Sequence, residues 1–184
     1  THADALHQAG NKTEAEHLFV EAEKMQAERQ PDYPLLYSLQ GFQYCDLLLA
    51  TSERITWQAM MNADCGMRNA DCGMRIAEWK EADGSGKSPH SEALRDVSKR
   101  AAKMFEWRLP GDSLLDIALD HLTLGHAGLY AAILEHSAND AHPDIESAVD
   151  GLRRSGNMDD IPRGLLTRAW LRSSTGSLQV NSGL

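Results

Sequence analysis

Residues 33–50 carry apolar side chains at the spacing of an α-helix, with one glycine inside the pattern. The apolar positions recur every three or four residues and are Leu36, Leu39, Tyr44, Leu47 and Leu48. Gly41 lies among them, although a glycine inside a helix costs about 1 kcal/mol relative to alanine. Close approach of a second helix is the expected reason for that cost. The stretch therefore predicts one half of a helical hairpin that packs tightly against a neighbour.

Apolar residues at helical spacing continue along most of the chain, with prolines and glycines at the expected helix ends. About eight helices are expected, near residues 3–9, 13–30, 34–51, 53–82, 91–107, 112–136, 143–155 and from 162 onward. Runs of valine, isoleucine or threonine are few, which disfavours a sheet. Glycine and alanine recur at the expected helix crossings. The pattern predicts an all-α protein, and an α-solenoid of stacked antiparallel helix pairs rather than a closed bundle.

The segment NADCGMR at residues 62–68 is repeated letter for letter at residues 69–75. Chance does not explain this repeat, which is either a tandem duplication or an error in the sequence. A helix can absorb such an insertion, because seven residues are almost two turns and the faces drift by only about 20°. The insertion would lengthen the helix by about 10 Å. Residues 83–89, DGSGKSP, follow it and predict a flexible loop.

The overall charge and composition limit the kinds of partner. A net charge of −9 disfavours nucleic acids and anionic membranes. Residues 1–184 have the length of a single domain, and 42% apolar residues are enough to form a core. Three sparse cysteines indicate reduced thiols in a cytoplasmic protein, and no apolar run is long enough to cross a bilayer. The chain opens on what resembles the second half of a helix and closes on the beginning of another connection, so we expect a fragment of a longer protein.

Several residues resemble the pattern of the tetratricopeptide repeat, a helix pair of about 34 residues. The matching residues are Gly10, Ala15, Phe19 and Ala22, then Tyr37, Gly41 and Tyr44, then Leu124 and Gly125, and finally Ala148, Leu152 and Pro162. Gln40 replaces the usual leucine, and Gly128 replaces a tyrosine. The phrases PDYPLLYSLQGFQYCDLLL, LLDIALDHLTLG and AVDGLRRSGNMDDIPRGLLTRA are similar to divergent tetratricopeptide-like arrays of large bacterial proteins.

The resemblance implies a protein-binding scaffold in a bacterial multidomain protein, where such arrays often follow a signalling or nucleotide-switch domain. It also implies that Gly41 is the small position at which the paired helix packs closely. We expect Gly41 to be buried against the helix that contains the duplication. Gly41→Leu is expected to destabilise the protein by about 1–3 kcal/mol through overpacking.

Two short motifs imitate known sites but lack the required spacing. Residues 84–88, GSGKS, imitate a phosphate-binding loop, yet Glu81 stands where the first glycine is needed and a helix precedes it. Cys65 and Cys72 are two helical turns apart, about 10 Å, which is too far to share one metal ion. A flexible linker and ordinary small side chains are the expected roles.

The histidines and paired carboxylates do not form a recognisable site either. His121 and His126 are five residues apart, so they do not align as ligands on one helix face. Asp116 and Asp120 indicate a solvated face of an acidic helix. No nucleophile motif accompanies these residues. We therefore expect no catalytic residue, no cofactor and no metal, and a protein that is not an enzyme.

In tetratricopeptide-like arrays the first helix of each pair lines a concave groove, and the register assigns this role to a set of residues here. They are Ser38, Phe42, Cys45, Asp46, Leu122, His126, Leu129 and Tyr130. We expect this groove to bind a peptide or protein segment, with Phe42 and Tyr130 as aromatic anchors. The alternative is that these side chains form a core, and that the chain is a structural or self-association module, for example a homo-oligomer. Solvent exposure along one concavity separates the two hypotheses.

Overall fold

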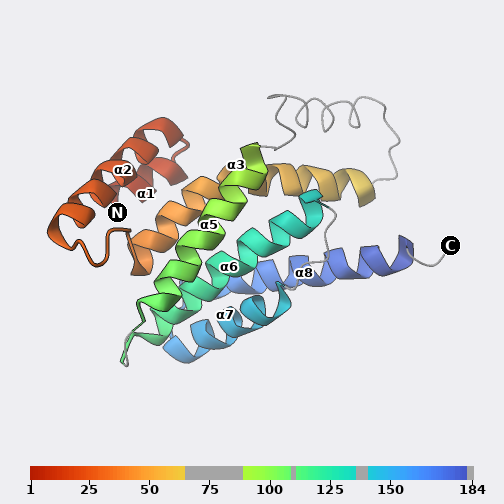
Figure 1. Ribbon diagram of the computed structural model, residues 1–184. Helices are drawn as coiled ribbons and strands as arrows, with labels where there is room; N and C mark the ends of the chain where they lie inside the picture. The colour runs from red at the N-terminus through yellow and green to blue at the C-terminus, as the bar shows by residue number, and fades with distance from the viewer. Residues whose placement is uncertain (65–88, 109–110, 136–140, 182–184) are drawn as a thin grey trace.

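The computed structural model describes residues 1–64, 89–108, 111–135 and 141–181, which contain seven helices and no strand (Figure 1). The helices are α1 (His2–Gln8), α2 (Lys12–Arg29), α3 (Ser38–Asp64), α5 (Pro89–Glu106), α6 (Leu114–Glu135), α7 (His142–Ser155) and α8 (Ile161–Asn181). The predicted all-α class is therefore confirmed, with seven described helices where the sequence predicts about eight.

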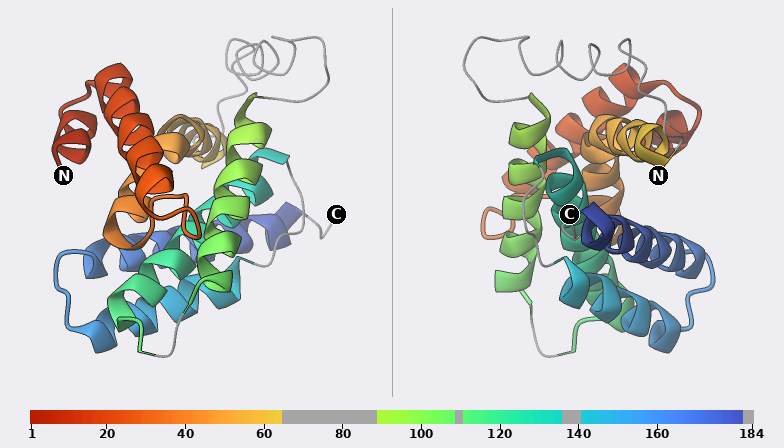
Figure 2. Two further views of the ribbon diagram at one scale, coloured as in Figure 1. Left: turned by 60° about the vertical axis from the view of Figure 1, so that its left-hand side comes forward. Right: turned by 90° about the vertical axis from the view of Figure 1, so that its right-hand side faces the viewer.

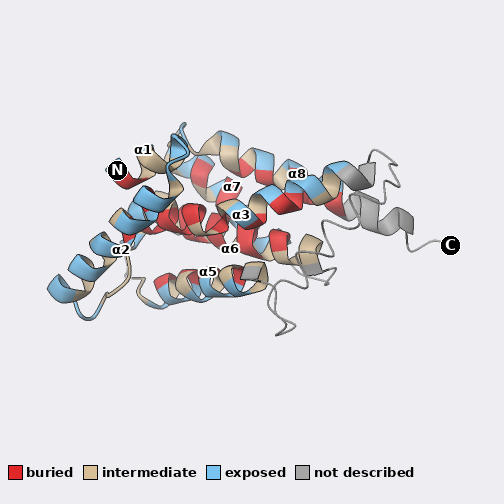
Figure 3. Cartoon of the chain, turned by 90° about the horizontal axis from the view of Figure 1, so that it is seen from above, coloured by how far each residue is buried: buried red, intermediate tan, exposed pale blue. Residues whose placement is uncertain are grey.

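Helix α6 lies at the centre of the fold and packs against α3, α5, α7 and α8 (Figure 2). Figure 3 shows buried residues gathered along α6 and on the helix faces turned towards it. The sequence suggests no membrane-spanning run, but in the described part of the chain one segment, Leu114–Leu134, is long and apolar enough to cross a membrane. Within this segment, 56% of the 18-residue window that meets the test is buried inside the protein. Burial on most sides is the reason that a core helix carries few polar residues.

Helices α1 and α2 form a smaller layer that packs against α3. Its core centres on Phe19, whose ring is stacked on Tyr44 with 5.0 Å between the ring centroids. The guanidinium of Arg100 in α5 lies 4.7 Å from the ring centroid of Tyr44 in α3 and pairs with Glu23 of α2 at 2.7 Å. These contacts fix α2, and with it the connection to α3, against α5.

Helix α3 differs from the predicted elements. The sequence predicts two helices at 34–51 and 53–82, but α3 runs without interruption from Ser38 through Ser52 to Asp64. Ser52 and Thr56 are fully buried, and the Thr56 hydroxyl donates to the Ser52 carbonyl at 2.7 Å. Because this hydroxyl is satisfied inside the helix, the polar residues do not end it. Pro34 lies in the connection that precedes α3 and does not open the helix.

Two sequence features lie largely outside the described residues. The structure describes the backbone of only the first residues of the duplicated segment, at the end of α3, and the lengthened helix stays a prediction. The expected loop at 83–89 is also outside, except for Pro89, which begins α5.

Small residues lie where α6 and α7 cross, as the sequence predicts. A Cβ atom on Gly125 would meet Ile145 Cγ1 at 2.6 Å, and one on Gly151 would meet the Cβ of Ala118 at 2.8 Å. Both distances are well below an ordinary carbon–carbon contact. The two helices therefore approach more closely than larger residues would allow.

Gly41 is buried, but against a different neighbour from the one expected. A Cβ atom there would meet the carbonyl oxygen of Leu36 at 2.5 Å and Met104 Cε at 2.8 Å. The close partners are thus α5 and the chain just before α3. The helix that contains the start of the duplication is α3 itself, to which Gly41 belongs, so the predicted partner is wrong while the predicted crowding is present.

Gly41→Ala is expected to lower the free energy of unfolding by about 1–3 kcal/mol, through overpacking. The Leu36 carbonyl is part of the backbone and cannot rotate away from an added methyl group. Urea denaturation monitored by circular dichroism measures the change. Unchanged or higher stability would contradict the prediction, because it would show that the helix propensity of alanine, worth about 1 kcal/mol, outweighs the contact.

Candidate functional site

The side chains that the resemblance assigns to a groove are mostly core residues. Those of Phe42, Cys45, Asp46, Leu122, His126, Leu129 and Tyr130 are at most 8% exposed, and Ser38 is partly buried. Phe42 packs among residues of α6 and α7, Cys45 among residues of α5 and α6, and the Tyr130 ring lies 5.2 Å from that of Trp170 in α8. Helices on several sides cover these positions, so they do not line an open groove in the described part of the chain.

Asp46 is held in a buried polar contact between three helices. Its carboxylate pairs with Arg163 of α8, and His7 Nδ1 of α1 lies 3.9 Å from the other carboxylate oxygen. The Arg163 guanidinium also lies 5.1 Å from the ring centroid of Phe42. Burial lowers the pKa of His7, so its imidazole is neutral at pH 7. Arg163 therefore supplies the positive charge that balances Asp46, which is a structural role.

His126 is a core histidine. Its Nε2 lies 2.7 Å from the hydroxyl of Thr167, which donates its own proton to the Arg163 carbonyl at 2.9 Å. Nε2 is therefore the donor in this pair. Burial lowers the pKa of His126 to about 4, so the ring is neutral at pH 7. Within the described ranges, no group of three or more histidine, cysteine, aspartate or glutamate side chains could hold a metal ion. His136, a further histidine at the end of the same helical pattern, lies outside those ranges.

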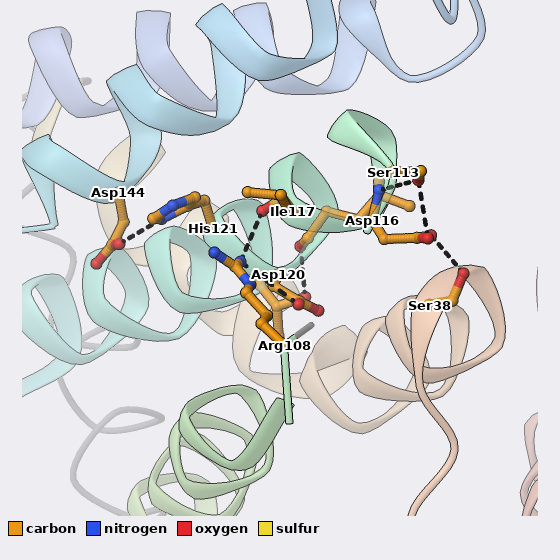
Figure 4. Close-up of polar contacts among 10 residues, drawn as sticks. Ser38, Arg108, Ser113, Asp116, Ile117, Asp120, His121 and Asp144 are labelled. Carbon is orange, nitrogen blue, oxygen red and sulfur yellow. Dashed lines mark hydrogen bonds and ion pairs between the residues drawn. The ribbon is translucent and has the colours of Figure 1, made fainter. Parts of the chain in front are cut away.

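Cys45 and His121 are also held in the packing of the protein. Burial raises the pKa of the Cys45 thiol to about 12, so it stays protonated and unreactive at neutral pH. His121 Nδ1 forms a hydrogen bond of 2.9 Å with Asp144 of α7, and its ring packs edge-on against Phe105 (Figure 4). Cys65 and Cys72 lie outside the described residues.

A cleft of about 590 Å³ opens where the α2–α3 connection, the end of α5 and the beginning of α6 meet. This volume lies in the range of ligand sites in proteins. Its lining combines aromatic, acidic and basic side chains, among them Tyr33, Tyr37, Trp107, Asp32, Asp112, Asp116, Asp120, Arg29 and Arg108. We name it the acidic–aromatic cleft. Of the predicted groove residues, Ser38 alone lines it.

Arg108 and Asp120 form an ion pair in this cleft, with 3.5 Å between Nη2 and Oδ2 (Figure 4). The same Nη2 donates to the Ile117 carbonyl at 3.2 Å, and the guanidinium lies 3.6 Å from the centroid of the Phe105 ring. Burial raises the pKa of Asp120 to about 6, although Arg108 acts in the opposite direction. The carboxylate is therefore charged at pH 7 in a site that disfavours its charge.

Asp116 joins the first residue of α3 to the first turn of α6. Its carboxylate accepts hydrogen bonds from the hydroxyls of Ser38 and, at 2.8 Å, Ser113 (Figure 4). Its backbone N–H donates to the Ser113 hydroxyl at 3.0 Å, so Ser113 caps α6. Ser38 has a φ of 57°, in the left-handed region that non-glycine residues rarely adopt. The hydroxyl contact with Asp116 fixes this unusual backbone beside the cleft.

The aromatic part of the cleft is held in place by its own contacts. The rings of Tyr33 and Trp107 meet edge to face with 5.5 Å between centroids, and Tyr37 lies 6.4 Å from Tyr33. Gln26 of α2 donates to the Tyr33 carbonyl at 3.2 Å and so anchors the connection. Tyr37 is 44% exposed. A largely preformed aromatic surface is therefore accessible to a ligand.

The sequence contains a signal for this cleft that the groove hypothesis does not use. Asp112, Asp116 and Asp120 recur every four residues. Asp116 and Asp120 share one face of α6, and Asp112 lies just before this helix. The expectation that Asp116 and Asp120 are both solvated is wrong for Asp120, which is 7% exposed and paired with Arg108. Spacing along α6 does not reveal that the end of α5 and the α2–α3 connection cover this face.

Comparison with protein-family models, curated proteins and solved structures gives no match for this chain. The resemblance to tetratricopeptide repeats therefore depends on the sequence pattern alone.

Proposed function

We propose that this chain is a non-enzymatic protein-interaction domain, and that it binds a peptide or protein segment in the acidic–aromatic cleft. The observation that supports this proposal is an open cleft of ligand-site volume with an accessible aromatic surface. Aromatic side chains supply much of the energy of protein interfaces. The proposed role is the one expected from a tetratricopeptide-like array, in which helix pairs form the scaffold. The proposed site is this cleft instead of the inner faces of the helices.

The polar groups of the cleft support binding rather than catalysis. Ser38 is the candidate nucleophile in the lining, and its hydroxyl is engaged with Asp116. A serine nucleophile needs a neighbouring base such as histidine, but His121 is bonded to Asp144 of α7 (Figure 4) and does not line the cleft. The Asp116 carboxylate accepts hydrogen bonds from two serine hydroxyls, and the Asp120 carboxylate is paired with Arg108.

Selection from a random peptide library, followed by affinity measurement with cleft variants, tests the proposed site. Tyr37→Ala is expected to weaken the selected peptides at least tenfold, in line with about 1.4 kcal/mol or more for an interface tyrosine. Leu39→Ala is the matched control, because Leu39 is 39% exposed against 44% for Tyr37 and does not line the cleft. Equal affinities for the two variants, or a selection without binders, would contradict the proposal.

A second candidate function is a structural or self-association module. Burial of the predicted groove residues supports it, together with exposed apolar residues on α3 and near α8: Trp57, Met61, Met158 and Leu166, which are 45–73% exposed. Exposed apolar residues that adjoin one another are typical of contacts with another protein or another copy. Light scattering across a concentration series separates the candidates, because a monomer at every concentration would leave only the binding role or attachment to other parts of a longer chain.

A further inference from the structure

The charged groups that line the acidic–aromatic cleft are unequal in number. Four carboxylates, Asp32, Asp112, Asp116 and Asp120, face two guanidinium groups, Arg29 and Arg108. Arg108 is already engaged by Asp120, the Ile117 carbonyl and the Phe105 ring. The lining therefore has a net negative formal charge, and its principal cation is directed towards the protein rather than towards a ligand.

Helix ends add to this negative potential. Helix α2 ends at Arg29 and α5 ends at Glu106, directly before Trp107, so two helix C-termini border the cleft. The carbonyl end of a helix carries about half a negative charge. The N-terminus of α6 also lies here, but Ser113 caps it and Asp116 in its first turn offsets its partial positive charge. Backbone and side chains thus favour a positively charged ligand.

The aromatic side chains favour the same class of ligand. Ammonium and guanidinium groups bind to the faces of tryptophan and tyrosine through cation–π attraction. Tyr33, Tyr37 and Trp107 line the cleft together with the carboxylates. Lys103, which does not line the cleft, lies with its Nζ 6.0 Å from the Trp107 ring centroid while it pairs with Glu106. An apolar ligand would gain from the rings but would take water away from the carboxylates without replacing it by a positive charge.

We propose that the acidic–aromatic cleft binds a lysine or arginine side chain carried by the partner segment. This inference rests on the proposed function, because it names the chemistry of the segment that the cleft accepts. The cationic group contacts the carboxylates at the start of α6, and its aliphatic stem packs against the aromatic rings, an arrangement for which long basic side chains are suited. Net charge −9 on the whole chain steers such a partner towards the protein.

The test uses acetylated and amidated pentapeptides Gly-Ser-X-Ser-Gly, in which X is arginine, lysine, citrulline or glutamate. Citrulline is the neutral counterpart of arginine with nearly the same shape. Titration of the full chain, followed through the indole N–H signal of Trp107 in NMR spectra, gives each affinity. Peptides with arginine or lysine are expected to bind at least tenfold more tightly than those with citrulline or glutamate.

Charge-removing variants locate the binding carboxylates. Asp116→Asn keeps an oxygen that accepts from one of the two serine hydroxyls, while its amide N–H can donate to the other hydroxyl. This variant is expected to weaken binding of the arginine peptide at least fivefold. Asp32→Asn, outside the helices, provides a second variant without a capping role. Asp150→Asn makes the same charge change at an exposed site on α7 and is expected to change the affinity less than twofold.

The possible results separate this inference from the proposed function. Equal binding of the arginine and citrulline peptides, with loss of both in Tyr37→Ala, would overturn the cationic ligand and leave the peptide-binding role in place. Absence of any shift at Trp107 for all pentapeptides, combined with selected peptides that do not depend on Tyr37, would overturn both. Tighter binding of the arginine peptide that is lost in Asp116→Asn and Asp32→Asn would support both.

Discussion

Replacing Arg163 with methionine is expected to lower the free energy of unfolding by about 2–4 kcal/mol at pH 7. The substitution leaves the carboxylate of Asp46, whose side chain is 9% exposed, without its cation. Breaking a fully buried ion pair costs about 3–5 kcal/mol, and the Arg163 side chain is 35% exposed, which reduces the expected loss. In the wild-type protein His7 does not share this role, because burial, the largest cause, lowers the pKa of its imidazole. Urea denaturation measures the change.

Two further variants show whether the stranded carboxylate is the cause. Asp46→Asn added to Arg163→Met removes the unpaired charge, so the double variant should recover at least half of the lost stability. Arg154→Met is the matched control, since Arg154 and its partner Asp150 are 63% and 67% exposed, and a change below about 0.5 kcal/mol is expected. If Arg163→Met and the double variant lose the same stability, the cause is the lost packing of Arg163 against the Phe42 ring and not the unpaired charge.

The sequence predicts the helices of this protein well, because their apolar periodicity is a local property. It also predicts close packing at Gly41 and at the glycines of the α6–α7 crossing, since a glycine inside a helix needs a neighbour that excludes a larger residue. It fails at the boundary near Ser52. Thr51 and Ser52 have the composition of a helix end, but burial of Ser52 and Thr56 between packed helices keeps α3 continuous. Tertiary contacts there override local preference.

The predicted groove fails for a related reason. An apolar stripe such as Phe42 and Cys45 on α3 shows which face of a helix is covered, but not which element covers it. In the structure, α5, α6 and α7 cover that face. The acidic–aromatic cleft could not be assembled from spacing, because Tyr33, Trp107 and Asp116 come from three separate parts of the chain. Only the four-residue recurrence of aspartates along α6 is visible in advance.

As the pH rises from 4 to 7, the free energy of unfolding of Asp120→Asn is expected to increase relative to that of the wild-type protein. The increase should reach up to about 3 kcal/mol. Burial raises the pKa of Asp120 from 3.8 to about 6, and each pKa unit corresponds to about 1.36 kcal/mol. Asp112 and Asp116 also raise this pKa, whereas Arg108 lowers it. The folded protein therefore holds the proton more tightly than the unfolded chain does.

The direction of the effect follows from this difference in proton binding. The stability that Asp120 contributes is fully present below pH 3.8, where the carboxyl is protonated in both states. It is lost as the pH rises through about 6, because the wild-type protein must then bury a charge. Asparagine does not titrate, so the variant avoids this loss. Thermal or urea unfolding of both proteins at several pH values measures the difference, from which the titration of all other groups cancels.

If the stability of Asp120→Asn relative to the wild-type protein stays constant or falls as the pH rises, the prediction is contradicted. Such a result would mean that Arg108 offsets the whole effect of burial on the pKa of Asp120. The same measurement connects to the proposed ligand. A cation bound beside Asp120 favours its charged form and so lowers its pKa. With a saturating arginine peptide, the stability difference between Asp120→Asn and the wild-type protein should therefore rise at lower pH. The citrulline peptide should leave the pH of this rise unchanged.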